Sequence, residues 1–138
     1  MKYKLLILGL ILIIIDQLTK FYFINKNFTV IPKILYIKYS TNPGLIFGFF
    51  SNNIFFIYVL PVLIIGILIY FYIKNTKLRI GLMLVVSGIL GNLIGRIIYG
   101  YVIDFIFIPI YPPYNISLFN ISDALIVFGV IYLVLKIK

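Results

Sequence analysis

The sequence contains no cysteine and no histidine, and only three of its 138 residues are acidic. Without cysteine the chain forms no disulfide and no thiolate metal site. Without histidine it forms neither a Ser-His-Asp triad nor an imidazole-ligated zinc site, and we expect no metal or other cofactor. Charged residues make up only 11% of the chain, against about 25% in ordinary soluble domains. This scarcity of charge excludes a soluble globular protein and a disordered chain.

Apolar residues make up 64% of the sequence and fall into four long stretches, at about residues 5–23, 54–73, 80–98 and 118–135. Each stretch is close to the roughly 20 residues that a helix needs to cross a bilayer. Backbone groups in lipid must be hydrogen-bonded internally, so each stretch is expected to be helical. The sequence therefore predicts an all-α polytopic membrane protein with four transmembrane helices, formed by residues 1–138 as a single domain.

The net charge of +9 does not indicate nucleic-acid binding, because the basic residues are dispersed at the ends of the apolar stretches. Seven of them fall on one side of a four-helix arrangement: Lys2, Lys4, Lys74, Lys77, Arg79, Lys136 and Lys138. Cytoplasmic loops carry an excess of Lys and Arg. Both termini are therefore expected in the cytoplasm, and residues 24–53 and 99–117 are expected to form outer loops.

The two outer loops are rich in apolar and aromatic residues. Residues 29–40 are rich in β-branched and aromatic types, which predicts short strands with Lys33 and Lys38 facing outward. Residues 99–114 are rich in Tyr and Phe, which is typical of segments that lie at the bilayer surface.

Each of the three acidic residues, Asp16, Asp104 and Asp123, lies within or beside a predicted membrane helix. Ionisable groups at such positions are costly and are candidates for function. A structural role is the alternative. Asp16 can pair with Lys20 four residues further along the same helix, and the other two can cap helices, although Asn120 or Ser122 can cap the last helix equally well.

If Asp104 and Asp123 converge at the outer surface, the two carboxyls cannot both ionise cheaply in a poorly hydrated site. They would then share one proton, which is the arrangement that aspartic peptidases use to hydrolyse peptide bonds. A Ser-Lys dyad is the other hydrolytic option, but no serine has an obvious link to Lys20, the one lysine within a predicted span. A small four-span transporter that couples to protons or cations through Asp16 is the alternative function.

Four blocks of sequence carry a family resemblance. They are Asp-Gln-Leu-Thr-Lys at 16–20, Asn-Pro-Gly-Leu-Ile-Phe-Gly at 42–48, Gly-Ile-Leu-Gly-Asn-Leu-Ile-Gly-Arg at 88–96 with Gly-Tyr-Val-Ile-Asp-Phe at 100–105, and Phe-Asn-Ile-Ser-Asp at 119–123. In this order and spacing, the chain resembles bacterial lipoprotein signal peptidase, also called signal peptidase II. The resemblance extends from the first predicted helix to the last.

The resemblance implies an aspartic endopeptidase of the bacterial cytoplasmic (inner) membrane with its active site on the extracytoplasmic side. Such an enzyme removes the signal peptide from diacylglyceryl-modified prolipoproteins and cleaves before the lipid-modified cysteine. It implies prolipoproteins and membrane lipids as partners, and globomycin-type peptides as inhibitors. It also adds a small extracytoplasmic β-cradle and a surface helix to the four spans, which we expect within residues 29–50 and 99–114.

Carried over to this sequence, the family's catalytic pair is Asp104 and Asp123. The resemblance also implies supporting or substrate-binding roles for Asp16, Lys20, Asn42, Gly44, Asn92, Arg96 and Asn120. Asn92 can instead only join two helices, and Arg96 can extend to the outer interface. The chain departs from the family at Gly95, where an Asp is usual, and at Leu45 and Ile46, where small residues are usual.

Overall fold

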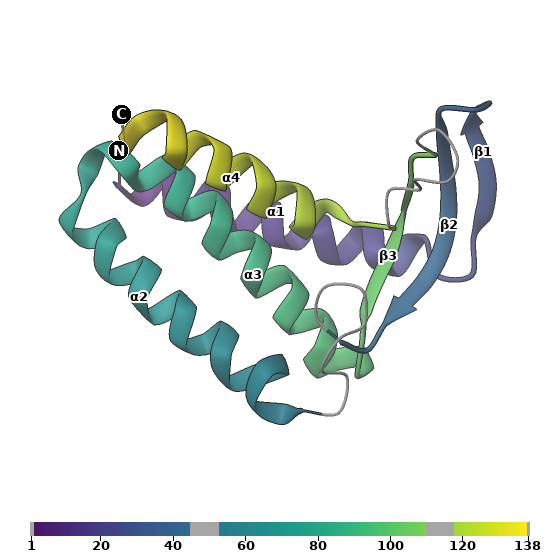
Figure 1. Ribbon diagram of the computed structural model, residues 1–138, viewed down its shortest axis with the longest axis horizontal. Coiled ribbons are helices and arrows are strands. Elements are labelled where there is room, and N and C mark those ends of the chain that lie inside the picture. Colours follow the sequence, from purple (N-terminus) through teal and green to yellow (C-terminus); the bar gives the residue numbers. More distant parts are fainter. Residues whose placement is uncertain (1, 45–52, 110–117, 138) are drawn as a thin grey trace.

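The computed structural model describes residues 2–44, 53–109 and 118–137 as a bundle of helices with a small sheet at one end (Figure 1). The helices are α1 (Lys2–Tyr22), α2 (Leu60–Lys74), α3 (Arg79–Tyr99) and α4 (Ile121–Ile137). The strands are β1 (Asn27–Ile31), β2 (Leu35–Asn42) and β3 (Val102–Phe107). Both chain termini lie at the end of the bundle opposite to the sheet (Figure 1).

Three helical segments are long and apolar enough to cross a membrane: Tyr3–Tyr22, Phe55–Lys74 and Thr76–Tyr99. They match the first three predicted spans. The fourth predicted span, 118–135, corresponds to α4, which begins three residues later at Ile121. The residues before it do not join the helix, because Phe119 forms an antiparallel bridge with Ile106 of β3.

The second of these segments begins irregularly. Asn53 Oδ1 accepts hydrogen bonds from the backbone N–H groups of Phe55 and Phe56, which caps the first turn. A π-helical turn over Phe55–Val59 follows, and it ends where Pro61 enters the first turn of α2. A proline has no N–H and its ring displaces the preceding carbonyl, so the wider turn accommodates it.

Helix α3 packs against α1, α2 and α4, and it is the most buried of the long helices. Glycines allow this close approach. A Cβ atom on Gly88 would lie 2.7 Å from Ile126 Cγ1 of α4, and one on Gly91 would lie 2.8 Å from Asp16 Oδ2 of α1. A Cβ atom on Gly95 would meet only ordinary contacts, the nearest being 3.7 Å from the carbonyl oxygen of Tyr101. Of the glycine pair at 91 and 95, only Gly91 is therefore required for close packing.

Replacing Gly91 by alanine is expected to lower the free energy of unfolding by about 1–3 kcal/mol, because the added methyl group overfills the junction of α1, α3 and α4. Gly66→Ala on α2 is the matched control, since a Cβ atom there meets nothing within 4 Å. Thermal unfolding in detergent micelles measures both variants. Equal stability of Gly91→Ala and Gly66→Ala would contradict the packing argument.

The three strands form one antiparallel sheet in the order β1-β2-β3. This confirms the strands predicted within residues 29–40 and the small sheet implied by the family resemblance. Lys33 lies in the turn between β1 and β2, and Lys38 is exposed, as predicted. The described parts of 29–50 and 99–114 contain no surface helix, while residues 45–50 and 110–114 of these ranges lie outside the described residues.

The chain turns from α3 into β3 at Gly100, which has a left-handed φ of 80° and donates its N–H to the carbonyl of Arg96. Glycine adopts this conformation without steric cost, so the turn is sharp. β3 then pairs with β2 so that Asp104 lies opposite Ser40. The neighbouring Ile103 and Phe105 are buried, and the ring of Phe105 stacks on Phe23 after α1 with centroids 4.6 Å apart. This packing fixes Asp104 at the junction of the sheet and the bundle.

Candidate active site

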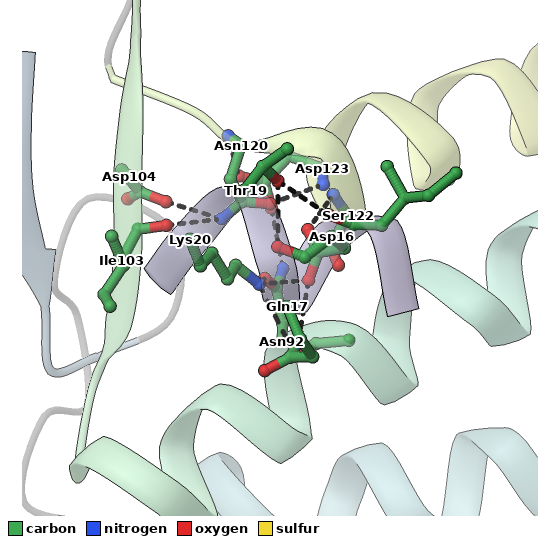
Figure 2. A network of polar contacts seen from close by, with 12 residues as sticks. Asp16, Gln17, Thr19, Lys20, Asn92, Ile103, Asp104, Asn120, Ser122 and Asp123 are labelled. Atoms are coloured by element: carbon green, nitrogen blue, oxygen red, sulfur yellow. Dashed lines mark hydrogen bonds and ion pairs between the residues drawn. The ribbon is translucent and has the colours of Figure 1, made fainter. Parts of the chain in front are cut away.

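All three acidic residues of the chain meet at one place, where the sheet adjoins the first turn of α4 (Figure 2). Asp16 comes from α1, Asp104 from β3 and Asp123 from α4. Asp16 has no exposed surface, Asp104 is 6% exposed, and Asp123 is half-buried. The site therefore joins three elements that lie far apart in the sequence.

Asn120 connects the two proposed catalytic carboxyls. Its Nδ2 donates a hydrogen bond to Asp104 Oδ1 at 2.6 Å, and its backbone N–H donates one to Asp123 Oδ2 at 3.1 Å. The Asn120 side chain is completely buried, so its position is fixed. Asp104 and Asp123 therefore both accept hydrogen bonds from Asn120, and the two side chains converge as the sequence predicted (Figure 2).

The backbone before α4 explains how Asn120 reaches both carboxyls. Phe119 exchanges backbone hydrogen bonds with Ile106 of β3, and this pairing holds the next residue beside Asp104. Asn120 Oδ1 then accepts the backbone N–H of Asp123 at 3.0 Å, while Asp123 accepts the N–H of Asn120. This reciprocal pair is a capping box in which Asn120 is the N-cap, as the sequence allowed, and Asp123 is the third residue of the helix. The alternative role of a helix cap is wrong for Asp104, because Asp104 lies in strand β3.

Asp16 and Lys20 form a buried ion pair on α1. Lys20 Nζ lies 2.7 Å from Asp16 Oδ2, and neither side chain is exposed. The other oxygen of Asp16 accepts the backbone N–H of Ser122 at 2.8 Å. A carboxylate at a helix N-terminus satisfies a free N–H group and complements the helix dipole. The ion pair with Lys20 is the structural pairing expected for Asp16, and the bond to Ser122 in addition holds the start of α4 against α1.

Lys20 makes a further contact with Asn92 of α3. Its Nζ donates to Asn92 Oδ1 at 2.9 Å and lies 3.3 Å from the carbonyl oxygen of Gly91. Asn92 Nδ2 in turn donates to Asp123 Oδ1 at 2.8 Å. Asn92 thus joins three helices, and the hydrogen bonds run without interruption from Asp16 to Asp104 (Figure 2).

Arg96 is buried, with 8% of its surface exposed, and does not extend to the outer interface. That alternative was wrong because its Nη2 donates to the carbonyl oxygen of Gly44 at 2.6 Å. Asn42 Oδ1 accepts the N–H of Gly44 at 3.1 Å, and the Asn42 side chain also hydrogen-bonds to Asp104. Arg96 and Asn42 therefore hold the end of β2 and Gly44 next to Asp104. Residues 45–48, the rest of this sequence block, lie outside the described residues.

Burial, reinforced by the charge of Asp123, raises the pKa of Asp104 from 3.8 to about 7. The charges around it explain how one proton is accommodated. Lys20 and Arg96 are the cations whose charges act on Asp104 and Asp123. With Asp16 ionised and one proton shared between Asp104 and Asp123, the two positive charges balance the two negative ones. The site is electrically neutral in this state.

The structure adds residues that the sequence had not singled out. Gln17 Nε2 donates to Asp16 Oδ2 and to the carbonyl oxygen of Gly91, both at 2.8 Å. The hydroxyl of Tyr58 lies 3.4 Å from the backbone carbonyl of Arg96. The position of Gln17 within the first sequence block was the available signal, whereas Tyr58 had none. Across residues 2–44, 53–109 and 118–137, no group of three Asp, Glu, His or Cys side chains is placed to hold a metal ion.

Comparison with known proteins bears on this geometry. The family model for signal peptidase (SPase) II matches residues 8–138, which include every residue of the site. The chain belongs to the signal peptidase II family. Among curated members, the lipoprotein signal peptidase of Clostridium tetani is 36% identical over 146 residues, covering 99% of this chain and 92% of the relative. That of Staphylococcus carnosus is 33% identical, covering 96% and 88%.

Solved structures support the same family. Two structures of a bacterial membrane enzyme determined by the in meso method superpose on this chain with TM-scores of 0.88 and 0.86. Both are 31% identical in sequence and cover 97% of this chain, which in turn covers 87% and 92% of theirs. Membership in the signal peptidase II family makes the chain a membrane peptidase, and the comparisons give no support to the transporter alternative.

Proposed function

We propose that this member of the signal peptidase II family is an aspartic endopeptidase that removes the signal peptide from diacylglyceryl-modified prolipoproteins, cleaving before the lipid-modified cysteine. Asp104 and Asp123 are the proposed catalytic pair. The observation that carries this proposal is that Asn120 hydrogen-bonds to both carboxyls in a chain that has no other acid except the paired Asp16. No cysteine or histidine is present to supply another nucleophile or base.

The hydrogen bonds indicate which carboxyl holds the proton. Both oxygens of Asp123 accept hydrogen bonds, one from Asn92 Nδ2 and one from the backbone N–H of Asn120. Donors directed at both oxygens favour the ionised form. Asp104 also accepts hydrogen bonds from Asn120 and Asn42, but its burial, reinforced by the charge of Asp123, outweighs them and raises its pKa to about 7. We therefore assign the shared proton to Asp104 and the base to Asp123.

In the proposed reaction, Asp123 removes a proton from a water molecule whose oxygen attacks the scissile carbonyl carbon. Asp104 donates its proton to the carbonyl oxygen, which neutralises the developing negative charge. Asp123 then passes its proton to the leaving amine, and the C–N bond breaks. Asp104 recovers its proton from the new carboxyl group, so the pair returns to its starting state with the peptide bond hydrolysed.

The membrane arrangement suits a lipid-anchored substrate. We propose that α4 forms a fourth span, since its 17 residues are at the lower limit of the roughly 17–25 that cross a bilayer. Lys74 and Lys77 lie at the same end as the termini, which supports our proposal that this end is cytoplasmic and that the site faces outward (Figure 1). Each buried methylene of a substrate acyl chain contributes about 0.8 kcal/mol, so the lipid sets the depth of the scissile bond.

The direct test is cleavage of a synthetic prolipoprotein by the purified enzyme in phospholipid vesicles. A substrate with a diacylglyceryl cysteine should be cut at that cysteine, and the same peptide without the lipid should not. Globomycin-type peptides should inhibit the reaction, because we expect them to occupy the dyad. Absence of cleavage together with a proton or cation flux that depends on Asp16 would favour the transporter instead.

The rate should fall as the pH rises through about 7, because Asp104 then loses the proton that it gives to the scissile carbonyl. Folding stability should follow the same sign. The folded protein holds this proton up to about pH 7, whereas the unfolded chain releases it near 3.8, so stability declines between these values. Steady-state rates in vesicles measured from pH 5 to 9 check the first expectation. A rate that keeps rising to pH 9 would rule out Asp104 as the proton donor.

A further inference from the structure

The buried ammonium group of Lys20 makes more contacts than its ion pair with Asp16 alone. It lies on the inner side of α1, and it directs hydrogen bonds at two other groups, Asn92 Oδ1 and the carbonyl oxygen of Gly91. A lysine has three N–H donors and no acceptor. Each of its contacts therefore fixes the orientation of the group that it meets.

The orientation of Asn92 follows from this donor. An amide has an acceptor oxygen on one side and a donor nitrogen on the other, and only the oxygen can face an ammonium group. With Oδ1 on Lys20 at 2.9 Å, Nδ2 must point away, and it meets Asp123 Oδ1 at 2.8 Å. Asp123 is thus presented with a donor, which a negatively charged carboxylate accepts more strongly than a protonated carboxyl does, so the contact favours the ionised form.

We propose that Lys20 is a positioning residue of the reaction: through Asn92 it keeps Asp123 ionised, so that the proton of the catalytic pair stays on Asp104. This inference rests on the proposed aspartic mechanism and adds a role that the Asp16–Lys20 ion pair alone does not provide. The ammonium polarises the Asn92 amide, and hydrogen bonds in series strengthen one another in a poorly hydrated interior.

The charges that face Lys20 come from every element around the site. Asp16 lies on its own helix, Asp104 on β3 and Asp123 on α4, and the remaining cation, Arg96, lies on α3. Arg96 bonds to the Gly44 carbonyl, so it acts on the carboxyls only through space. Lys20 is therefore the cation joined to Asp123 by hydrogen bonds within the described residues.

The test compares pH–rate profiles of the full-length enzyme in vesicles with a lipid-modified prolipoprotein as substrate. Lys20→Met removes the charge, and both limbs of the profile should move to higher pH, by about one unit on the acid side, because an opposite charge at this range shifts a carboxyl by about that much or more. Lys20→Arg keeps the charge, and its acid limb should stay near that of the wild type. Lys26→Met is the matched control, since it removes the same charge outside the network.

A second variant guards against misfolding, because Lys20→Met leaves Asp16 buried without its partner. Asp16→Asn/Lys20→Met removes both buried charges together, and it should show an acid limb displaced in the same direction. Lower rates with unshifted limbs in these variants would overturn the proposal and leave Lys20 a structural residue. That result is distinct from failure of the proposed function, which would appear as an active Asp104→Asn enzyme or an inactive wild type.

Discussion

Asp104→Asn is expected to lower kcat by about 10³-fold while the protein stays folded, because an amide keeps the shape of the carboxyl but has no proton to give to the scissile carbonyl. The hydrogen bond from Asn120 Nδ2 to Oδ1 of residue 104 can form with either side chain. The variant removes a buried group that must ionise above pH 7 in the wild type, so at pH 8 it should be at least as stable. Cleavage of a lipid-modified prolipoprotein and thermal unfolding at pH 8 measure the two quantities.

The neighbouring acid provides a comparison. Asp123→Asn should lose activity to a similar extent, but it should also lose stability, since Asp123 accepts hydrogen bonds from Asn92 and from the first turn of α4. Ser40→Ala, at the β2 position opposite Asp104, is the control for general disturbance of the sheet. Turnover near the wild-type rate in Asp104→Asn would remove the basis for the catalytic pair.

Asp16→Ala is expected to cost about 3–5 kcal/mol of folding stability, the usual effect of leaving a buried charge unpaired. The change strands Lys20, which is completely buried, and also leaves the backbone N–H of Ser122 without its acceptor. Thermal unfolding in detergent, together with the yield of membrane-inserted protein, measures the effect.

The double variant Asp16→Asn/Lys20→Met separates the two causes. It removes the stranded charge and keeps an oxygen near the N–H of Ser122, so it should recover most of the lost stability. If Asp16→Ala unfolds at the wild-type temperature, the ion pair between α1 and the start of α4 contributes little, and our account of how these helices are joined fails.

The sequence predicted the elements that depend on local pattern. The apolar stretches gave three helices close to their observed bounds, and the scarcity of acids directed attention to Asp104 and Asp123. It did not reveal that Phe119 pairs with β3, which delays the start of α4 and brings Asn120 between the two carboxyls. Such contacts depend on tertiary packing, and they cannot be predicted from the periodicity of apolar residues along the sequence.

The same limit explains the error at Arg96. An arginine near the end of an apolar helix usually extends to the membrane interface. Arg96 instead points inward, because its Nη2 donates a hydrogen bond to the carbonyl oxygen of Gly44, 52 positions away in the sequence. Asp16 shows the reverse case. Its pairing with Lys20 was predictable because the two residues are four positions apart on one helix, whereas its bond to Ser122 crosses 106 positions.

The network of three aspartates has a consequence for biosynthesis. Its members extend from Asp16 in the first helix to Asp123 in the last. Asn120, which hydrogen-bonds to both Asp104 and Asp123, directly precedes α4 and is therefore synthesised after the first three helices. If Asp104 and Asp123 are the catalytic pair, as we propose, a nascent chain that contains only the first three helices lacks Asn120 and Asp123 and has no peptidase activity.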